Sequence, residues 1–439
     1  MERNFRWVGI LLVVACCSRV SVVVSSPGHL SEDRDAYLGI AQELAAGNGF
    51  STPGSNRPTA FRPPLYPLVL LQNIKMDGGS KSLGAIHILL GVLTVLLTVQ
   101  LGQRLGLQRG RYWAGLFVAV DPLLVQYTSF PMTETLFTFL VTGLLLMLVG
   151  AGEKSTASSS VARQFFTGAV FGLCALCRPT IWAFGLLLVF WKLARYLLGR
   201  FRKNSEEANS TTWRSMISWP CLVALVLIVL PWGIRNNQQF GKFKFTTTHG
   251  GYTLLLGNNP VFYAEVVNQP WGTVWQGDSL DRWQQRVDSD FEAANPGKQN
   301  ELERDTWMYR RAIDNISSDL PSFFRSCGLR FLRFWNVFPL SPSLRGTSST
   351  IVWGIGLFYS FIGCGLALGL FRILKHGCCQ KWIAPILLLI AFTAVHLFFW
   401  SNMRMRAPLV PAIALISILG WSQIFERKTE PVPSVDRVA

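Results

Sequence analysis

The chain has 439 residues, half of them hydrophobic and only 15% charged, with a net charge of +16 and a mean hydropathy of +0.31. Soluble globular proteins usually carry about 25% charged residues, so this composition suits lipid rather than a water-solvated surface. The positive charge does not indicate nucleic-acid binding, because the Lys and Arg residues lie in short loops between apolar runs and form no compact basic domain.

Apolar runs long enough to cross a membrane recur along the chain, since a transmembrane helix needs about 20 residues. We expect about ten spans, at 8–26, 83–103, 113–131, 134–151, 164–178, 180–197, 216–233, 349–371, 382–400 and 407–425. The first run continues past Arg19, which favours a retained helix over a cleaved signal peptide. The shorter apolar stretch 65–74 predicts a re-entrant or interfacial helix.

The basic loops predict the orientation of these spans. If the spans alternate, the short loops near 104–111, 154–163, 200–214, 375–381 and 427–428, all rich in Lys and Arg, fall on the side of the N-terminus. By the positive-inside rule this side is the cytoplasm. We therefore expect a multi-pass protein of the cell (inner) membrane with both termini in the cytoplasm.

Two long polar segments fall on the outer side and divide the chain. Residues 1–235 form the predicted N-terminal transmembrane module, which includes a first outer loop at 25–82. Residues 236–348 form a small outer domain with helices near 281–291 and 300–316, and residues 349–439 form the last spans and a cytoplasmic tail. The predicted fold class is an all-α polytopic membrane protein with interfacial helices in the first outer loop.

Acidic residues gather at the outer ends of helices. Asp33 and Asp35 precede an amphipathic helix that begins at Tyr37, and Glu134 lies at the outer mouth of the fourth span. Helix capping explains part of this pattern. A carboxylate at the membrane boundary can also accept a proton from a hydroxyl or bind a cation. Asp121, inside the third span next to Pro122, is a weaker candidate that can kink the helix.

Five arginines lie on the outer side, against the cytoplasmic bias: Arg62, Arg178, Arg235, Arg404 and Arg406. Anchoring at lipid headgroups is one explanation. The other is phosphate recognition, because a guanidinium offers a planar, permanently charged fork of N–H donors. Acids and arginines on one side together suggest a reaction on a lipid phosphate or pyrophosphate.

The ordered set of motifs resembles a known superfamily over nearly the whole chain. The set comprises Asp33-x-x-x-Tyr37, Gly47-Asn48-Gly49-Phe50, Arg62-Pro63-Pro64-Leu65-Tyr66-Pro67, the Glu134 helix mouth, Cys177-Arg178-Pro179, Pro231-Trp232-x-x-Arg235-Asn236, Gly250-Gly251, Gly257-Asn258-Asn259-Pro260 and Arg404-x-Arg406-x-Pro408. It is similar to the GT-C membrane glycosyltransferases, and within them to the dolichyl-phosphate-mannose–protein mannosyltransferase and aminoarabinose transferase branch.

The resemblance implies an active site on the outer, periplasmic face and an inverting transfer from a polyprenyl-phosphate sugar donor to a hydroxyl or amine. The acceptor class, protein, lipid or glycan, stays open. Asp33 matches the first-loop Asp, but the following residue, acidic in many relatives, is Arg34 here, so Asp33 and Asp35 both remain candidate bases. This departure also weakens a metal site: no cofactor is required, although a divalent cation is possible.

The remaining roles follow from the same resemblance. Glu134 is expected to orient the acceptor or a cation, and the five outer arginines are expected to bind the donor phosphate. The predicted substrate pocket comprises Tyr37, Tyr66, Asn236, Gly257 and Asn258. The expected partners are the lipid-linked donor, the acceptor and membrane lipid. Two alternatives remain: a transporter or flippase of lipid-linked sugars, and a ligase that uses a lipid-pyrophosphate glycan.

Overall fold

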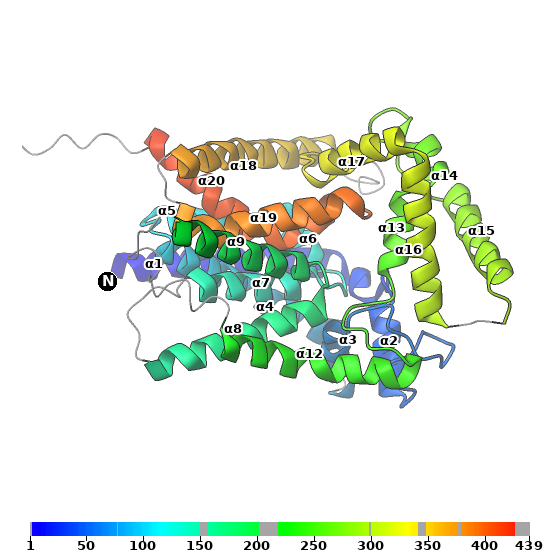
Figure 1. The fold of residues 1–439 in the computed structure, drawn as a ribbon. Helices are drawn as coiled ribbons and strands as arrows, with labels where there is room; N and C mark the ends of the chain where they lie inside the picture. Colours follow the sequence, from blue (N-terminus) through cyan, green and yellow to red (C-terminus); the bar gives the residue numbers. More distant parts are fainter. Residues whose placement is uncertain are drawn as a thin grey trace, which may run out of the picture.

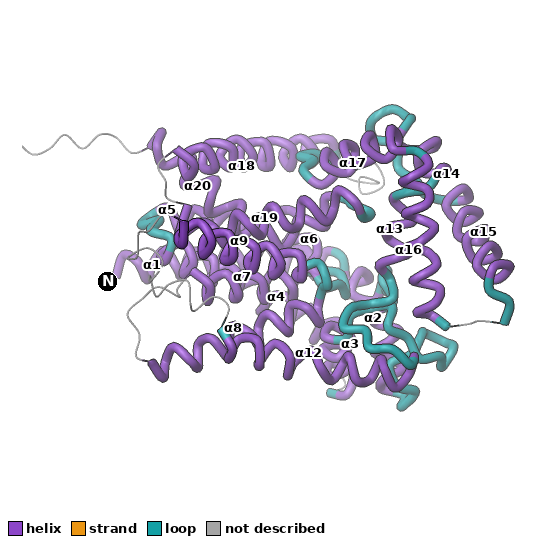
Figure 2. Tube along the Cα trace, viewed as in Figure 1, coloured by secondary structure: helices purple, strands orange, loops and turns teal. Residues whose placement is uncertain are grey.

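The computed structural model describes residues 2–76, 78–149, 157–201, 218–297, 300–340, 348–375 and 379–425. Within these ranges the regular elements are helices, and Ser51 and Pro58 form an isolated antiparallel bridge. Figure 2 shows helices joined by loops throughout, with no strand in the part of the chain that is described. The predicted all-α class is confirmed for these residues.

Within the described residues, seven helical segments are long and apolar enough to cross a membrane. They are α1 (Glu2–Ser25), α4 (Ser80–Arg104), α9 (Ile181–Phe201), α12 (Trp219–Phe240), α18 (Ser349–Lys375), α19 (Cys379–Phe398) and η5 with α20 (Met403–Leu409 and Val410–Phe425). Two further helices, α7 (Glu134–Val149) and α8 (Ala157–Cys177), are apolar over shorter stretches, at Glu134–Val149 and Val161–Cys177. The chain is therefore an integral membrane protein, whereas the count of about ten spans stays a prediction.

The expected span at 113–131 is interrupted. Helix α5 (Gly110–Val120) ends before Asp121, and the short helix α6 (Pro122–Tyr127) begins directly after it. The Asp121 carboxylate caps α6 by accepting from the Leu124 N–H at 3.0 Å. Pro122 stands at the first turn of α6, where its missing N–H costs no hydrogen bond. The kink that the sequence suggested at Asp121 is thus a break between two helices.

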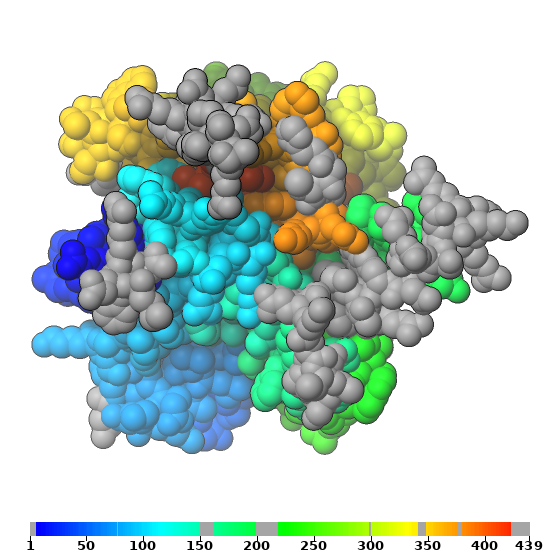
Figure 3. All heavy atoms as spheres, turned by 90° about the vertical axis from the view of Figure 1, so that its left-hand side faces the viewer, coloured from blue at the N-terminus to red at the C-terminus, as the bar shows by residue number. Residues whose placement is uncertain are grey.

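The long helices lie roughly along one direction, and the polar segments gather at one end of the bundle (Figure 1). At that end lie α2 (Tyr37–Ala45), α3 (Leu65–Lys75), α13 (Gly250–Gly257), α15 (Asp278–Ala294) and α16 (Glu301–Ser318). The start of α1 and the end of α20 lie at the opposite end. Figure 3 looks onto that opposite end, where blue and cyan N-terminal helices share the surface with yellow and orange C-terminal ones.

The apolar side chains form a large core in the bundle and a separate one in the segment after α12. The second core includes Phe262, Trp275, Trp283 and Met308. Helices α15 and α16 form at the residues predicted for this segment, while α13 and α17 (Leu320–Phe334) were not predicted. The described part of 236–348 thus has a core of its own next to the first loop.

Candidate active site

Five charged side chains from distant parts of the sequence converge at the polar end of the bundle. We call Asp35, Arg62, Glu134, Arg178 and Arg404 the charge cluster. The carboxylate of Asp35 pairs with Arg62 Nη2 and with Arg404 Nη1, each at 3.1 Å. The carboxylate of Glu134 pairs with Arg178 Nη2 at 2.5 Å and with Arg404 Nε at 3.1 Å. Arg404 therefore joins the two halves of the cluster.

A strained residue turns the first loop so that its two aspartates face different ways. Ala36 has a φ of +61° and a ψ of +15°, in the left-handed region that residues with a Cβ rarely adopt. Before this turn, the exposed Asp33 carboxylate caps α2 by accepting from the N–H groups of Leu38 and Gly39, at 3.0 and 2.7 Å. Asp35 instead points inward, to the arginines.

The protein keeps Asp35 ionised. Burial alone would raise the pKa of its carboxyl group, but the guanidinium groups of Arg404 and Arg62 outweigh burial, and the pKa lies below its usual value. Arg62 also donates from Nε to the Asp35 main-chain carbonyl at 2.7 Å, so one side chain grips both the backbone and the carboxylate of this residue. Asp35 is thus a fixed anion that orients two arginines.

Glu134 is fully buried at the start of α7. Its partner Arg178 follows directly after α8 and donates from Nε to the Thr133 hydroxyl at 2.7 Å. The Thr133 side chain, directly before α7, therefore serves as a second anchor for Arg178. A buried carboxylate with two cationic partners is the arrangement that makes such burial tolerable.

Each arginine of the cluster keeps one guanidinium nitrogen free of oxygen acceptors. Among the described residues, no oxygen accepts from Arg62 Nη1, Arg178 Nη1 or Arg404 Nη2. Three guanidinium groups against two carboxylates also leave the cluster with one net positive charge. The cluster can therefore bind an anion without breaking its internal ion pairs.

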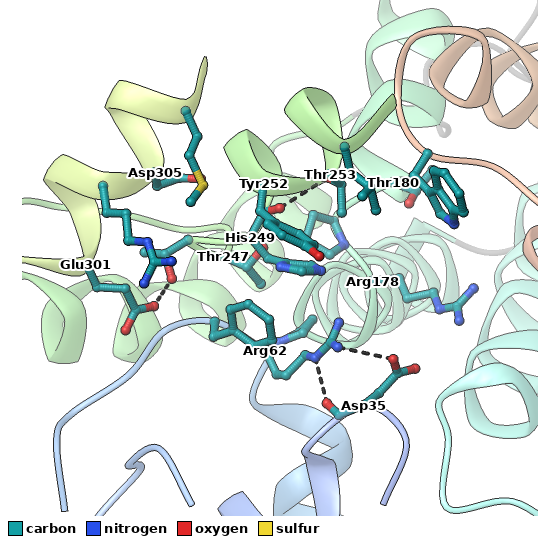
Figure 4. A pocket seen from close by; sticks show the side chains of 18 of the residues that line it. Asp35, Arg62, Arg178, Thr180, Thr247, His249, Tyr252, Thr253, Glu301 and Asp305 are labelled. Atoms are coloured by element: carbon teal, nitrogen blue, oxygen red, sulfur yellow. Dashed lines mark hydrogen bonds and ion pairs between the residues drawn. The ribbon is translucent and has the colours of Figure 1, made fainter. Parts of the chain in front are cut away.

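The cluster borders a cavity of about 740 Å³. Arg62, Arg178 and Asp35 line it together with residues of the outer segment (Figure 4), and Arg404 lines it as well. The cavity is large enough for a small-molecule group such as a phosphorylated sugar.

Another part of the wall comes from the outer segment, and sequence reasoning missed most of it. It includes His249, Tyr252, Gln284, Glu301 and Asp305. The Gly250-Gly251 pair marked this region in the sequence without assigning it a role. The structure supplies the reason for the pair, because a Cβ at Gly251 would clash with the Asp305 carbonyl of α16 and one at Gly250 with the Tyr309 hydroxyl.

Two of the five predicted phosphate-binding arginines lie elsewhere. Arg235 donates to the main-chain carbonyls of Phe50 and Thr59, at 2.6 and 2.7 Å, and so ties the first loop to α12. Arg406 stacks on Tyr359 and donates to the Asn336 carbonyl at 3.1 Å. Neither lines this cavity: Arg235 binds main-chain carbonyls of the first loop, and Arg406 contacts Asn336 and Tyr359.

The predicted pocket residues also separate. Tyr37 lines the cavity. Tyr66 packs edge-on against Tyr37, its hydroxyl 3.0 Å from His87 Nε2. The remaining residues make internal hydrogen bonds: Asn236 to the Lys244 carbonyl, and Gly257 and Asn258 with Arg330. These contacts hold segments together away from the cavity.

The described residues contain no group of three or more His, Cys, Asp or Glu side chains placed to hold a metal ion. Asp35 and Glu134 each face guanidinium groups.

No protein-family model and no curated protein matches the sequence. Among solved structures, the oligosaccharyltransferase AglB of Archaeoglobus fulgidus, in complex with an inhibitory peptide and a dolichol-phosphate, is similar over 96% of this chain with a TM-score of 0.55 and 17% identity. This chain shares the fold of the matching part of AglB. It spans about half of AglB, 51% of whose chain is covered.

A second structure of the Archaeoglobus enzyme, with Zn and sulfate, gives a TM-score of 0.52 at 17% identity and covers 94% of this chain and 49% of that one. ArnT from Cupriavidus metallidurans, bound to undecaprenyl phosphate, is also similar, at 16% identity over 96% of this chain and 78% of its own. Its TM-score of 0.43 adds no weight to the fold.

Proposed function

We propose that this protein is an inverting membrane glycosyltransferase that moves a sugar from a polyprenyl-phosphate donor to a hydroxyl or amine of an acceptor. The observation that carries the proposal is the charge cluster, with three free guanidinium nitrogens and one net positive charge at a 740 Å³ cavity. A polyprenyl-phosphate sugar is a phosphodiester with one negative charge. It therefore matches the net charge of the cluster.

The cluster also suits the chemistry of the departing group. When the bond between C1 of the sugar and the phosphate oxygen breaks, the polyprenyl phosphate gains a second negative charge. Arg62, Arg178 and Arg404, oriented in advance by Asp35 and Glu134, stabilise that charge as it develops. A single displacement at C1 by the acceptor inverts the configuration. A double displacement needs a free carboxylate as nucleophile, and both carboxylates of the cluster are held by arginines.

An apolar cavity next to the cluster is suited to the polyprenyl chain. Its volume is about 600 Å³, and its lining is mainly apolar: Leu44, Phe50, Pro64, Leu68, Leu176, Ile228, Pro231 and Trp232, with Asn48, Ser51, Arg235 and Gln239 among the polar residues that also line it. Pro64 follows Pro63 of the larger cavity, and Leu176 lies two residues before Arg178. A lipid lying here would reach the cluster with its phosphate. AglB, which shares this fold, is described with a dolichol-phosphate bound.

The basic helix ends support a cytoplasmic placement for the end of the bundle opposite the cluster. Arg104 closes α4, and Arg372 and Lys375 close α18 at that end. With the termini in the cytoplasm of an inner-membrane protein, the cavity opens to the outer, periplasmic face. In this arrangement residues 236–348 form the outer domain between the two transmembrane parts.

Sugar transfer by the purified protein tests the proposal. The chain in nanodiscs is given polyprenyl phosphate carrying a radiolabelled sugar, with candidate acceptors, and the label on the acceptor or released to water is measured. We expect transfer by the wild type and none by Arg404→Gln. Arg286→Gln, which changes an exposed arginine of α15, is the matched control and should stay active.

The alternatives give different results in the same system. A flippase moves the labelled lipid across vesicle membranes without breaking the sugar–phosphate bond. A ligase uses a polyprenyl-pyrophosphate glycan in place of the monophosphate sugar. Lipid movement without sugar cleavage, or activity with the pyrophosphate donor alone, would overturn the proposal.

A further inference from the structure

We propose that His249 is the base that accepts the proton of the acceptor hydroxyl or amine during transfer. This inference rests on the proposed function. The sequence pointed to the first-loop aspartates for this role, whereas the proposal assigns it to a residue of the outer segment that also lines the cavity.

The carboxylates of the cavity are already engaged. Asp35 is held by two arginines, Asp288 pairs with Arg304, and Asp305 accepts from Lys244 at 2.6 Å and from the Gly251 N–H at 2.7 Å. Glu301 accepts from the Ala60 N–H and the Thr248 hydroxyl. Ion pairs and donated hydrogen bonds stabilise the charged form of a carboxylate and weaken it as a base. Burial outweighs them at Glu301 and raises the pKa of its carboxyl group, but both donated bonds fix its Oε1 to the backbone and side chain of neighbouring loops.

His249 differs from these groups in having no hydrogen-bond partner. Its Nδ1 is buried without a partner among the described residues, and the half-buried ring lines the cavity. The ring packs on the edge of Phe61, with centroids 4.1 Å apart, and stacks on Tyr252 at 5.2 Å. Aromatic contacts on two sides hold the ring in place, and its nitrogen atoms stay available to accept a proton.

The surrounding backbone places this ring next to the phosphate-binding arginines. The Thr248 N–H donates to the Ala60 carbonyl at 3.0 Å, so the segment before His249 pairs with the loop that carries Arg62. The Arg62 guanidinium in turn lies 4.6 Å from the centroid of the Phe61 ring. Figure 4 shows Arg62 between His249 and Asp35. An acceptor that enters between His249 and a phosphate on Arg62 meets the base and the donor together.

Electrostatics keep His249 in its neutral, proton-accepting form. Burial and the positive charge of Arg62 lower the pKa of the imidazole well below 6.5, and Asp35 opposes them only in part. These two charges and the Tyr252 hydroxyl are the titratable groups that face the ring. When the donor binds, its negative charge lies on the Arg62 side and raises the pKa of the imidazole again, which makes His249 a stronger base in the complex.

The step balances with the groups present. The acceptor oxygen or nitrogen forms a bond to C1, its proton moves to a ring nitrogen of His249, and the electron pair of the C1–O bond leaves with the polyprenyl phosphate. The imidazolium then returns its proton to the phosphate dianion or to water, which restores the neutral ring for the next turnover.

Two variants separate proton transfer from ring packing. His249→Phe keeps an aromatic ring between Phe61 and Tyr252 but cannot accept a proton. We expect kcat to fall about 100- to 10,000-fold, the usual contribution of a general base, with an unchanged Kd for polyprenyl phosphate. His249→Ala leaves space, and added imidazole should restore part of its kcat. The control His29→Gln changes a histidine outside the cavity and should leave kcat unchanged.

The pH profile gives an independent readout. In the wild type, kcat/KM should fall at low pH with a midpoint below pH 6.5. The value of kcat should fall with a midpoint at a higher pH, because the bound donor raises the pKa of His249. Both acid limbs should be absent in His249→Phe.

If the wild type transfers sugar while His249→Phe keeps its kcat and its acid limb, the proposal for His249 fails alone. If the wild type transfers no sugar, the proposed function fails and this inference falls with it.

Discussion

Replacing Arg178 separates the two roles that the structure gives it, as a partner of Glu134 and as a phosphate ligand. Arg178→Gln leaves Glu134, which is fully buried, with Arg404 as its remaining cation at 3.1 Å. Breaking a buried ion pair by removing one partner costs about 3–5 kcal/mol. Since Arg404 still neutralises the carboxylate, we expect a loss near the lower end of this range or below it, about 2–3 kcal/mol.

The same change removes one charge-assisted hydrogen bond to the donor phosphate. Such a bond is worth about 1.5–3 kcal/mol, which corresponds to roughly a 10- to 150-fold rise in Kd. The assay is binding of polyprenyl phosphate to the chain in nanodiscs, together with thermal unfolding of the same samples. Arg286→Gln, at the exposed face of α15, serves as the control for both measurements.

The double variant Arg178→Gln with Glu134→Gln distinguishes the contact from the net charge. It removes both partners of the buried pair and keeps the net charge of the cluster at its wild-type value. We expect its thermal stability to recover toward the wild type while its affinity for polyprenyl phosphate stays about ten-fold weaker or more. If the double variant binds the lipid as tightly as the wild type, Arg178 does not touch the phosphate.

Further predictions concern the first loop and Arg235. Asp35→Asn should abolish transfer. Asp33→Asn keeps one of the two oxygens that accept from α2, so it should retain most activity and lose about 1 kcal/mol of stability with the other hydrogen bond; transfer and melting measurements check both. Because the pKa of folded Asp35 is lowered, its ion pairs stabilise the fold above pH 4 or so and are lost as pH falls through that pKa, so acid should lower the wild-type melting temperature more than that of Asp35→Asn. Arg235→Gln should lower the melting temperature by loosening the first loop. Ala36→Gly should melt near the wild-type temperature, and Ala36→Val should melt lower, because its branched side chain opposes the left-handed backbone by about 1–2 kcal/mol.

Helix positions were predictable because apolar runs set them. The runs at 83–103, 134–151 and 349–371 correspond to α4, α7 and α18, with ends shifted by a few residues. The run at 113–131 misled because its composition is apolar although Asp121-Pro122 breaks it. The mean hydropathy of a window of residues hardly changes with one such pair. The missing N–H of proline and the capping carboxylate nevertheless end one helix and begin the next at a single position.

The arginines were predictable as a class but not one by one. Arg178 and Arg235 both follow a membrane helix or lie near its end, next to prolines or aromatic residues, and the sequence gives them the same role. In the structure, Arg178 faces a carboxylate, and Arg235 faces two main-chain carbonyls. Which partner a long side chain reaches depends on how distant segments of the chain pack, as the hydrogen bond from Arg235 to Thr59, 176 residues apart, illustrates. The local sequence pattern around an arginine contains no information about such distant partners.

The role of Asp35 and Glu134 follows from the negative charge of the lipid phosphate, which increases from one to two during transfer. Three unpaired guanidinium groups in a largely buried site would be costly to desolvate and would bind a dianionic product more tightly than a monoanionic donor. Asp35 and Glu134 reduce the net charge to one, so the resting cluster matches the donor, and the fixed guanidinium forks still point their free nitrogens at the position where the second charge forms. On this reasoning Glu134→Gln, which raises the net charge, strengthens binding of the product polyprenyl phosphate and slows its release. Product inhibition measured for this variant and the wild type tests this, and equal inhibition would show that the acids act through orientation alone.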